Sequence, residues 1–71
     1  MAEMIQLRQG EDYIKLGQAL KAAAFVSSGA EAKEVILEGL VLVNGEKECR
    51  RGKKLYAGDV VLYDKQEIKI S

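Results

Sequence analysis

The feature that most constrains the fold is a change of hydrophobic period near residue 40. Before this point apolar residues recur every three or four positions, as on one face of a helix, and after it they alternate with polar residues, as in a half-buried strand. Two helices are therefore expected to precede several short strands. Because the chain has 71 residues, we expect residues 1–71 to form a single domain with one small core.

Two helices are predicted in the first half of the chain. The first covers about residues 15–23, where four apolar residues share one stripe: Leu16, Ala19, Leu20 and Ala23. The second lies within residues 27–39. Ser28 and Glu31 have the spacing of a capping box at its start, and Gly39 stands where a left-handed residue ends many helices.

The strands are predicted from alternation and turn residues. One strand is expected at residues 4–9, with Ile5 and Leu7 on the same face. Asn44 and Gly45 indicate a hairpin between a strand at residues 40–43 and its return strand, and two more strands follow. The return strand is expected at 46–50 and the later ones at 60–63 and 67–70. The pattern predicts an α+β fold in which two short helices pack on a small sheet.

Positive charge is concentrated after the first hairpin. The chain has 11 basic and 11 acidic residues, yet residues 47–54 alone carry a net charge of +4. Such segregation favours a polyanionic ligand, because each phosphate neutralised by Lys or Arg releases condensed counterions. Gly52, in the middle of the cluster, lets the backbone approach a ligand closely. The structural alternative is a solvated charged loop.

The start of the second helix is a second candidate for anion binding. A helix N-terminus presents free N–H groups, and Lys33 lies one turn further on. Ser28 is expected to cap this helix whether or not an anion binds. The candidate phosphate-binding residues are Lys15, Ser28, Lys33, Arg50, Arg51, Lys53 and Lys54.

Other classes of function find little support. The sequence has no histidine and one cysteine, which excludes disulfide frameworks, Cys/His zinc sites and the usual nucleophile–base pairs, so we expect no cofactor and no enzymatic activity. Cys49 is either a reactive thiol between basic neighbours or a small strand residue, and the second reading is preferred. Apolar stretches are too short to span a bilayer and no signal peptide is visible, so a cytoplasmic protein is expected.

Aromatic residues are sparse, which argues for recognition through backbone and shape rather than through bases. Phe25 is expected in the core between the helices. Tyr13 and Tyr56 either stack on a ligand or lie partly buried at an edge.

Four segments in order resemble the S4 RNA-binding domain: "KLGQAL", "SSGAEAKEVI", "EGLVLVNG" and "KKLYAGDVV", within residues 13–63. Two positions depart from the family pattern. Gly17 stands where many members have aspartate, and Gly29 stands where many have an arginine that contacts RNA. The combination of "SSGAEAK" and "CRRGKKL" is similar to a subgroup of short stand-alone bacterial proteins.

The resemblance implies a helix pair on a strongly bent antiparallel sheet (the αL motif), with RNA along the second helix and the loop after the first hairpin. It implies structured RNA as the partner, chiefly rRNA or tRNA, possible contexts being a ribosomal subunit, its assembly or a stalled large subunit. We expect a monomer with no small-molecule substrate. The alternative is a protein-interaction module that docks its basic loop on an acidic protein.

Overall fold

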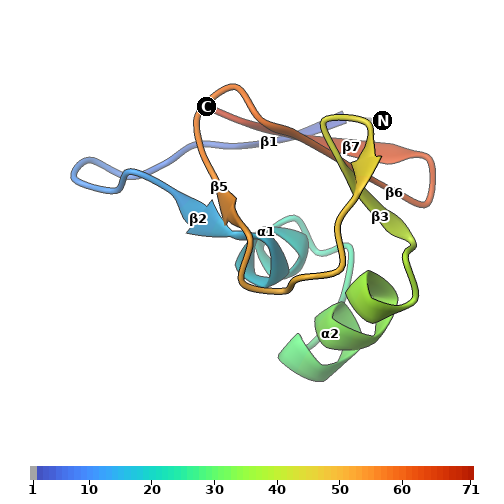
Figure 1. Ribbon diagram of the computed structural model, residues 1–71. Helices are drawn as coiled ribbons and strands as arrows, with labels where there is room; N and C mark the ends of the chain where they lie inside the picture. Colours follow the sequence, from blue (N-terminus) through green and yellow to red (C-terminus); the bar gives the residue numbers. More distant parts are fainter. Residues whose placement is uncertain (1) are drawn as a thin grey trace.

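The computed structural model describes residues 2–71 and contains two helices and seven short strands (Figure 1). In chain order the elements are β1 (Ala2–Ile5), β2 (Ile14–Lys15), α1 (Leu16–Ala22), α2 (Gly29–Leu37), β3 (Val41–Val43), β4 (Glu46–Lys47), β5 (Lys54–Leu55), β6 (Val60–Tyr63) and β7 (Gln66–Ile70). Neither helix in this range is long and apolar enough to cross a membrane. The predicted α+β class and both helices are confirmed.

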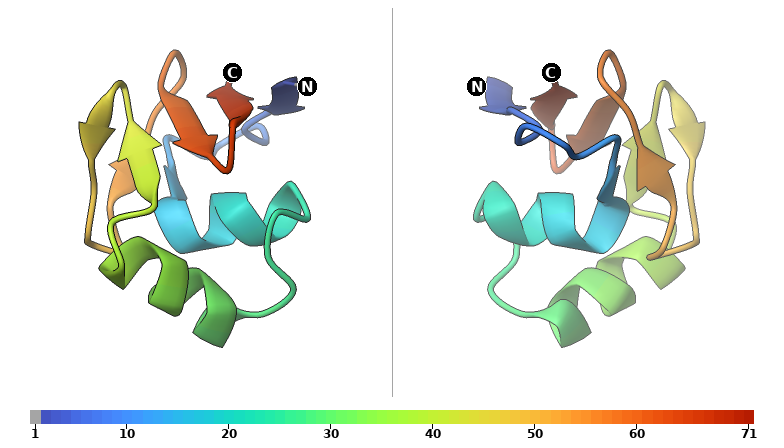
Figure 2. Two further views of the ribbon diagram at one scale, coloured as in Figure 1. Left: turned by 90° about the vertical axis from the view of Figure 1, so that its right-hand side faces the viewer. Right: turned by 90° about the vertical axis from the view of Figure 1, so that its left-hand side faces the viewer.

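Five strands form the main sheet, in the order β1-β7-β6-β3-β4, and β2 pairs with β5 in a separate two-stranded ribbon. Both helices lie on one side of the main sheet, with α1 between the sheet and α2 (Figure 2). The pairs formed by β3, β4, β6 and β7 are antiparallel, as predicted. β1 instead runs parallel to β7, so the sheet is mixed and the expectation of a wholly antiparallel sheet is wrong for this pair.

Two strands differ by more than one residue from their predicted extents. β1 ends at Ile5, although backbone pairing with the C-terminal segment continues where the Leu7 N–H donates to the Ser71 carbonyl (2.8 Å). Ile5 and Leu7 pack partly against the core, which confirms their shared face. β4 ends at Lys47 rather than residue 50. There the Glu48 carboxylate accepts the Arg50 N–H (3.1 Å), so a side chain replaces the strand partner of this backbone group.

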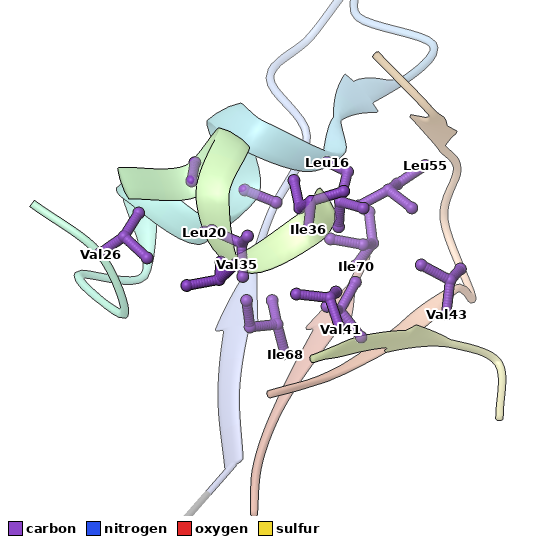
Figure 3. Close-up of a cluster of buried hydrophobic side chains, with 13 residues drawn as sticks. Leu16, Leu20, Val26, Val35, Ile36, Val41, Val43, Leu55, Ile68 and Ile70 are labelled. Carbon is purple, nitrogen blue, oxygen red and sulfur yellow. The ribbon is translucent and has the colours of Figure 1, made fainter. Parts of the chain in front are cut away.

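The core lies between the helices and the sheet, and all of its buried members are apolar (Figure 3). In this core the predicted apolar stripe of α1 packs together with the inward-facing side chains of the strands. The largest fully buried side chains are Leu16, Leu20, Ile36, Leu55, Ile68, Val41 and Val61. Within the described range no buried side-chain nitrogen or oxygen lacks a hydrogen-bond partner. The interior therefore consists of packed apolar side chains, and groups that could bind a polar ligand lie at the surface.

The residues predicted to cap α2 lie at its two ends. Ser28 Oγ accepts the Glu31 N–H (3.1 Å), while the Glu31 carboxylate accepts the Ser27 N–H (2.7 Å) rather than that of Ser28, so only half of the expected capping box forms. At the other end Gly39 has φ +77° and its N–H donates to the Ile36 carbonyl (3.1 Å). This left-handed residue ends the helix as predicted.

Candidate nucleic-acid interface

The basic loop, residues 48–53, is anchored on the first turn of α1 by backbone hydrogen bonds. The Leu16 N–H donates to the Lys53 carbonyl (2.9 Å) and the Gly17 N–H donates to the Arg51 carbonyl (3.1 Å). The first N–H groups of a helix have no partner within the helix, and here the loop supplies the acceptors. The segment between β4 and β5 consequently passes across α1 (Figure 1). Two backbone carbonyl groups hold the loop on α1, so this anchoring uses no charged group of the Arg51 or Lys53 side chain.

Gly17 permits the close approach of this loop to α1. A Cβ at this position would lie 2.7 Å from Arg51 Cγ and 3.3 Å from Arg51 Cδ, both inside normal contact distance. The aliphatic stem of Arg51 therefore occupies the space that any larger residue would fill. This contact gives a structural reason for one departure from the family pattern: the aspartate common at this position would displace the arginine stem.

Three hollows meet at Gly52 in the basic loop. The first, about 330 Å³, lies between α1 and the start of α2 and is lined by Lys15, Gly17, Gln18, Lys21, Gly29, Arg51 and Gly52. The second, about 290 Å³, borders α2 and is lined by Lys33, Ile36, Leu37, Cys49, Arg51 and Gly52. The third, about 510 Å³, is lined by Arg50, Gly52, Lys53, Lys54 and Tyr56. A Cβ on Gly52 would meet nothing within 4 Å, so the loop backbone is open to a ligand at this junction.

The charged residues that line these three hollows are all basic. Seven of the 11 Lys and Arg residues take part, and none of the acidic residues that the structure describes does so. Lys15 and Lys54 are direct register partners in the β2–β5 ribbon. Like charges directly opposite one another destabilise a strand pair, and a bound anion would relieve the repulsion. The surface thus has the electrostatics of a polyanion site.

Arg50 differs from its basic neighbours because it is held by Glu48. Its Nε lies 3.1 Å from Glu48 Oε2, and this is the ion pair found among residues 2–71. The hydrogen bond from the Arg50 side chain lowers the pKa of Glu48, and the same bond raises the pKa of Arg50. Arg50 therefore contributes less unbalanced positive charge to this surface than Arg51, Lys53 or Lys54.

The structure brings six of the seven candidate residues to the three hollows. Lys15 lines the first, Lys33 the second, Arg51 both of these, and the third is lined by Arg50, Lys53 and Lys54. Ser28 stands apart: it caps α2, next to Gly29 at the rim of the first hollow. Lys21 and Gln18 also line the first hollow and were not among the candidates. Gln18 follows Lys15 by three residues and Lys21 follows Gln18 by three, and this helical spacing was the available signal.

The fold and the surface define a small α+β domain with a basic loop laid across a helix pair. The S4 domain family model matches residues 5–71, and the chain belongs to this family. The *Bacillus subtilis* "Probable ribosome maturation protein RlbA" is 54% identical over 50 residues, 70% of either chain. The *Escherichia coli* "Putative RNA-binding protein YbcJ" is 34% identical over 58 residues, 82% of this chain and 83% of YbcJ.

A third relative is much longer than this chain. The *Schizosaccharomyces pombe* "Small ribosomal subunit protein uS4m" is 35% identical over 54 residues, which cover 76% of this chain and 16% of that protein. The similarity to this protein is therefore one of a domain, whereas RlbA and YbcJ are matched over most of their lengths.

Proposed function

We propose that this protein is a non-enzymatic RNA-binding protein that recognises structured RNA, with rRNA as the foremost candidate. The observation that carries the proposal is the junction at Gly52, where three hollows meet and every charged lining residue is basic. Membership of the S4 domain family and the names of RlbA and YbcJ support RNA over other polyanions. A ribosomal ligand would place the protein in the cytoplasm.

The proposed phosphate contacts follow the lining of the hollows. They are Lys15, Lys21, Lys33, Arg51, Lys53 and Lys54, with Arg50 partly engaged by Glu48 and Ser28 acting at the capped start of α2. Each phosphate neutralised contributes a slope of roughly −0.7 to −0.9 in log affinity against log salt. We therefore expect strong dependence of binding on salt and little dependence on base sequence.

The biological role proposed is occupancy of a site on a ribosomal subunit during its assembly or maturation. The domain would act by binding, since the proposal assigns it no chemical step. The names of the relatives from *B. subtilis* and *S. pombe* are the support for the ribosomal context. A tRNA-bound or stalled large subunit is the other context compatible with structured RNA.

The test is crosslinking in cells followed by sequencing of the bound RNA, for the wild type and for a double charge reversal. Arg51→Glu with Lys53→Glu reverses two charges at the junction. Lys65→Glu with Lys69→Glu changes the net charge equally on the exposed surface of the β6–β7 hairpin, away from the hollows, and is the matched control. Reads concentrated on one rRNA helix should disappear in the first variant only. Equal reads in all three proteins would refute the proposed interface.

A protein partner for the basic loop is the alternative that this experiment must separate. Affinity capture before and after ribonuclease treatment does so. If RNA is the ligand, co-purified proteins should be lost after the treatment. Recovery of the same acidic protein after ribonuclease, with loss on charge reversal, would instead support a protein-interaction module.

A further inference from the structure

Two tyrosines lie beside the basic loop and contact each other. Tyr13 precedes β2 and Tyr56 follows β5, so the antiparallel register of Ile14 with Leu55 brings them together. Their ring centroids are 6.0 Å apart and the ring planes are tilted by 53°. Both rings keep access to solvent, since Tyr13 is 36% and Tyr56 is 49% exposed.

The two rings are not equivalent. Lys54 Nζ lies over the Tyr13 ring, 4.9 Å from its centroid, so a cation already covers this ring. Tyr56 has its neighbour Tyr13 on one side and lines the third hollow on another. The remaining lining of that hollow consists of Arg50, Gly52, Lys53 and Lys54. An aromatic wall is thus combined with three cations around one open space of about 510 Å³.

We propose that the third hollow is a nucleotide site, in which an unpaired base of the RNA stacks on Tyr56 while Lys53 and Lys54 hold the flanking phosphates. This inference rests on the proposed RNA-binding function and adds a base contact to it. Aromatic side chains bind unstacked bases with little sequence preference, because every base presents a π-face. The protein would therefore prefer structured RNA with a bulged or terminal unpaired nucleotide over a continuous duplex.

The surroundings of Tyr56 hold it in position before RNA arrives. Its N–H donates to Asp59 Oδ2 (2.7 Å), and the Asp59 N–H donates back to the Tyr56 carbonyl (3.0 Å), which closes the turn after β5. Contact with Tyr13 restricts the ring. A side chain already ordered loses less conformational entropy on binding, so more of the stacking free energy appears as affinity.

The test compares two RNA hairpins that have identical stems, each with one bulged nucleotide. In one hairpin the bulge carries a purine base, and in the other it is an abasic residue, so the two have equal numbers of phosphates. The wild type should bind the base-bearing hairpin about tenfold more tightly. Tyr56→Leu should bind both hairpins with the lower affinity, and Tyr56→Phe should keep the preference.

A second readout requires no variant. The ring protons of Tyr56 should shift in the NMR spectrum when the base-bearing hairpin is added and should shift much less with the abasic hairpin. Equal affinity of the wild type for both hairpins, with salt-dependent binding retained, would overturn the base site and leave the proposed function standing. Failure to bind either hairpin at low salt would overturn both.

Discussion

Asn44 and Asp59 join two turns that lie on different strand connections. Asn44 Nδ2 donates to Asp59 Oδ1 (3.1 Å), and Asn44 Oδ1 accepts the Val60 N–H (3.0 Å). The other carboxylate oxygen of Asp59 accepts the Tyr56 N–H (2.7 Å). The hairpin tip between β3 and β4 is thereby tied to the turn that precedes β6. Asn44 and Asp59, which both belong to the segments that resemble the S4 domain, thus form one hydrogen-bonded unit that stabilises the fold.

Removing the Asn44 side chain should therefore destabilise the protein without altering the basic surface. We expect Asn44→Gly, which keeps the left-handed backbone (φ +53°), to lower the free energy of unfolding by about 1–3 kcal/mol through two lost hydrogen bonds. Asn44→Ala should cost more, since alanine is strained at this φ. Urea unfolding measures both. An Asn44→Gly protein as stable as the wild type would show that the link to Asp59 contributes nothing.

Ala24 is a position where the native residue is not the most stable one. It follows α1 with φ +60°, and the Phe25 N–H beyond it donates to the Leu20 carbonyl (3.0 Å), as in a helix end that normally uses glycine. Ala24→Gly should raise the free energy of unfolding by roughly 1 kcal/mol. The neighbouring Ala23 has φ −82°, so Ala23→Gly should be destabilising. Thermal unfolding of the two variants checks the opposite signs.

Gly17 should affect RNA binding although it carries no charge. Gly17→Ala places a methyl group 2.7 Å from Arg51 Cγ, which must move the arginine stem off α1. We expect the protein to remain folded and to bind RNA several-fold more weakly. In an Arg51→Ala background the same change should have no further effect. Additive losses in this double-mutant cycle would contradict the proposed contact.

Glu48 is expected to restrain binding by neutralising Arg50. Glu48→Gln keeps an acceptor for the Arg50 N–H but removes the carboxylate charge from the ion pair. RNA affinity at low salt should rise, and the slope of log affinity against log salt should steepen by up to about 0.9 if Arg50 then reaches a phosphate. Titrations at several salt concentrations measure both quantities. An unchanged slope would mean that Arg50 remains outside the interface.

Stability should fall at acidic pH partly through Glu31. Hydrogen bonding from the Ser27 N–H and hydroxyl lowers the pKa of this carboxyl below its ordinary value of 4.5. The contribution of the Glu31 carboxylate to the free energy of unfolding is complete above that ordinary value, because there the carboxylate is ionised in both the folded and the unfolded state. This contribution is lost as pH falls through the lower pKa of the folded state. Glu31→Gln should lower the urea midpoint at pH 7 and flatten its fall between pH 5 and 3. A parallel pH profile in the variant would contradict this role.

The sequence predicted the helices well because their signals are local. The apolar stripe of α1, the Ser28 cap and Gly39 each act within a few residues, and the structure confirms all three. The parallel pairing of β1 with β7 was missed, because alternation gives a strand its faces but not the direction of its partner. Beyond β4 the Glu48 side chain accepts the Arg50 N–H, a hydrogen bond that no strand pattern encodes.

The residues of the candidate site could be predicted only in part, for a similar reason. Charge density marked the basic loop, and six candidates do line the hollows around Gly52. The anchoring of the loop on α1 rests on carbonyl groups of Arg51 and Lys53, which every residue possesses, so the sequence holds no sign of it. Lys21 shares a helical spacing with Lys15 and Gln18, but the docking of the loop is what places all three beside Arg51 and Gly52.

The pairing of β1 with β7 also bears on the order of events during synthesis. Ala2 is the register partner of Glu67, so β1 leaves the ribosome long before the strand that completes it. The helices and β3 to β6 can associate earlier, while contacts this distant along the chain form late because closing a long loop costs entropy. We expect the nascent chain to hold β1 unpaired until β7 has emerged, so that the final step of folding joins the two ends of the domain.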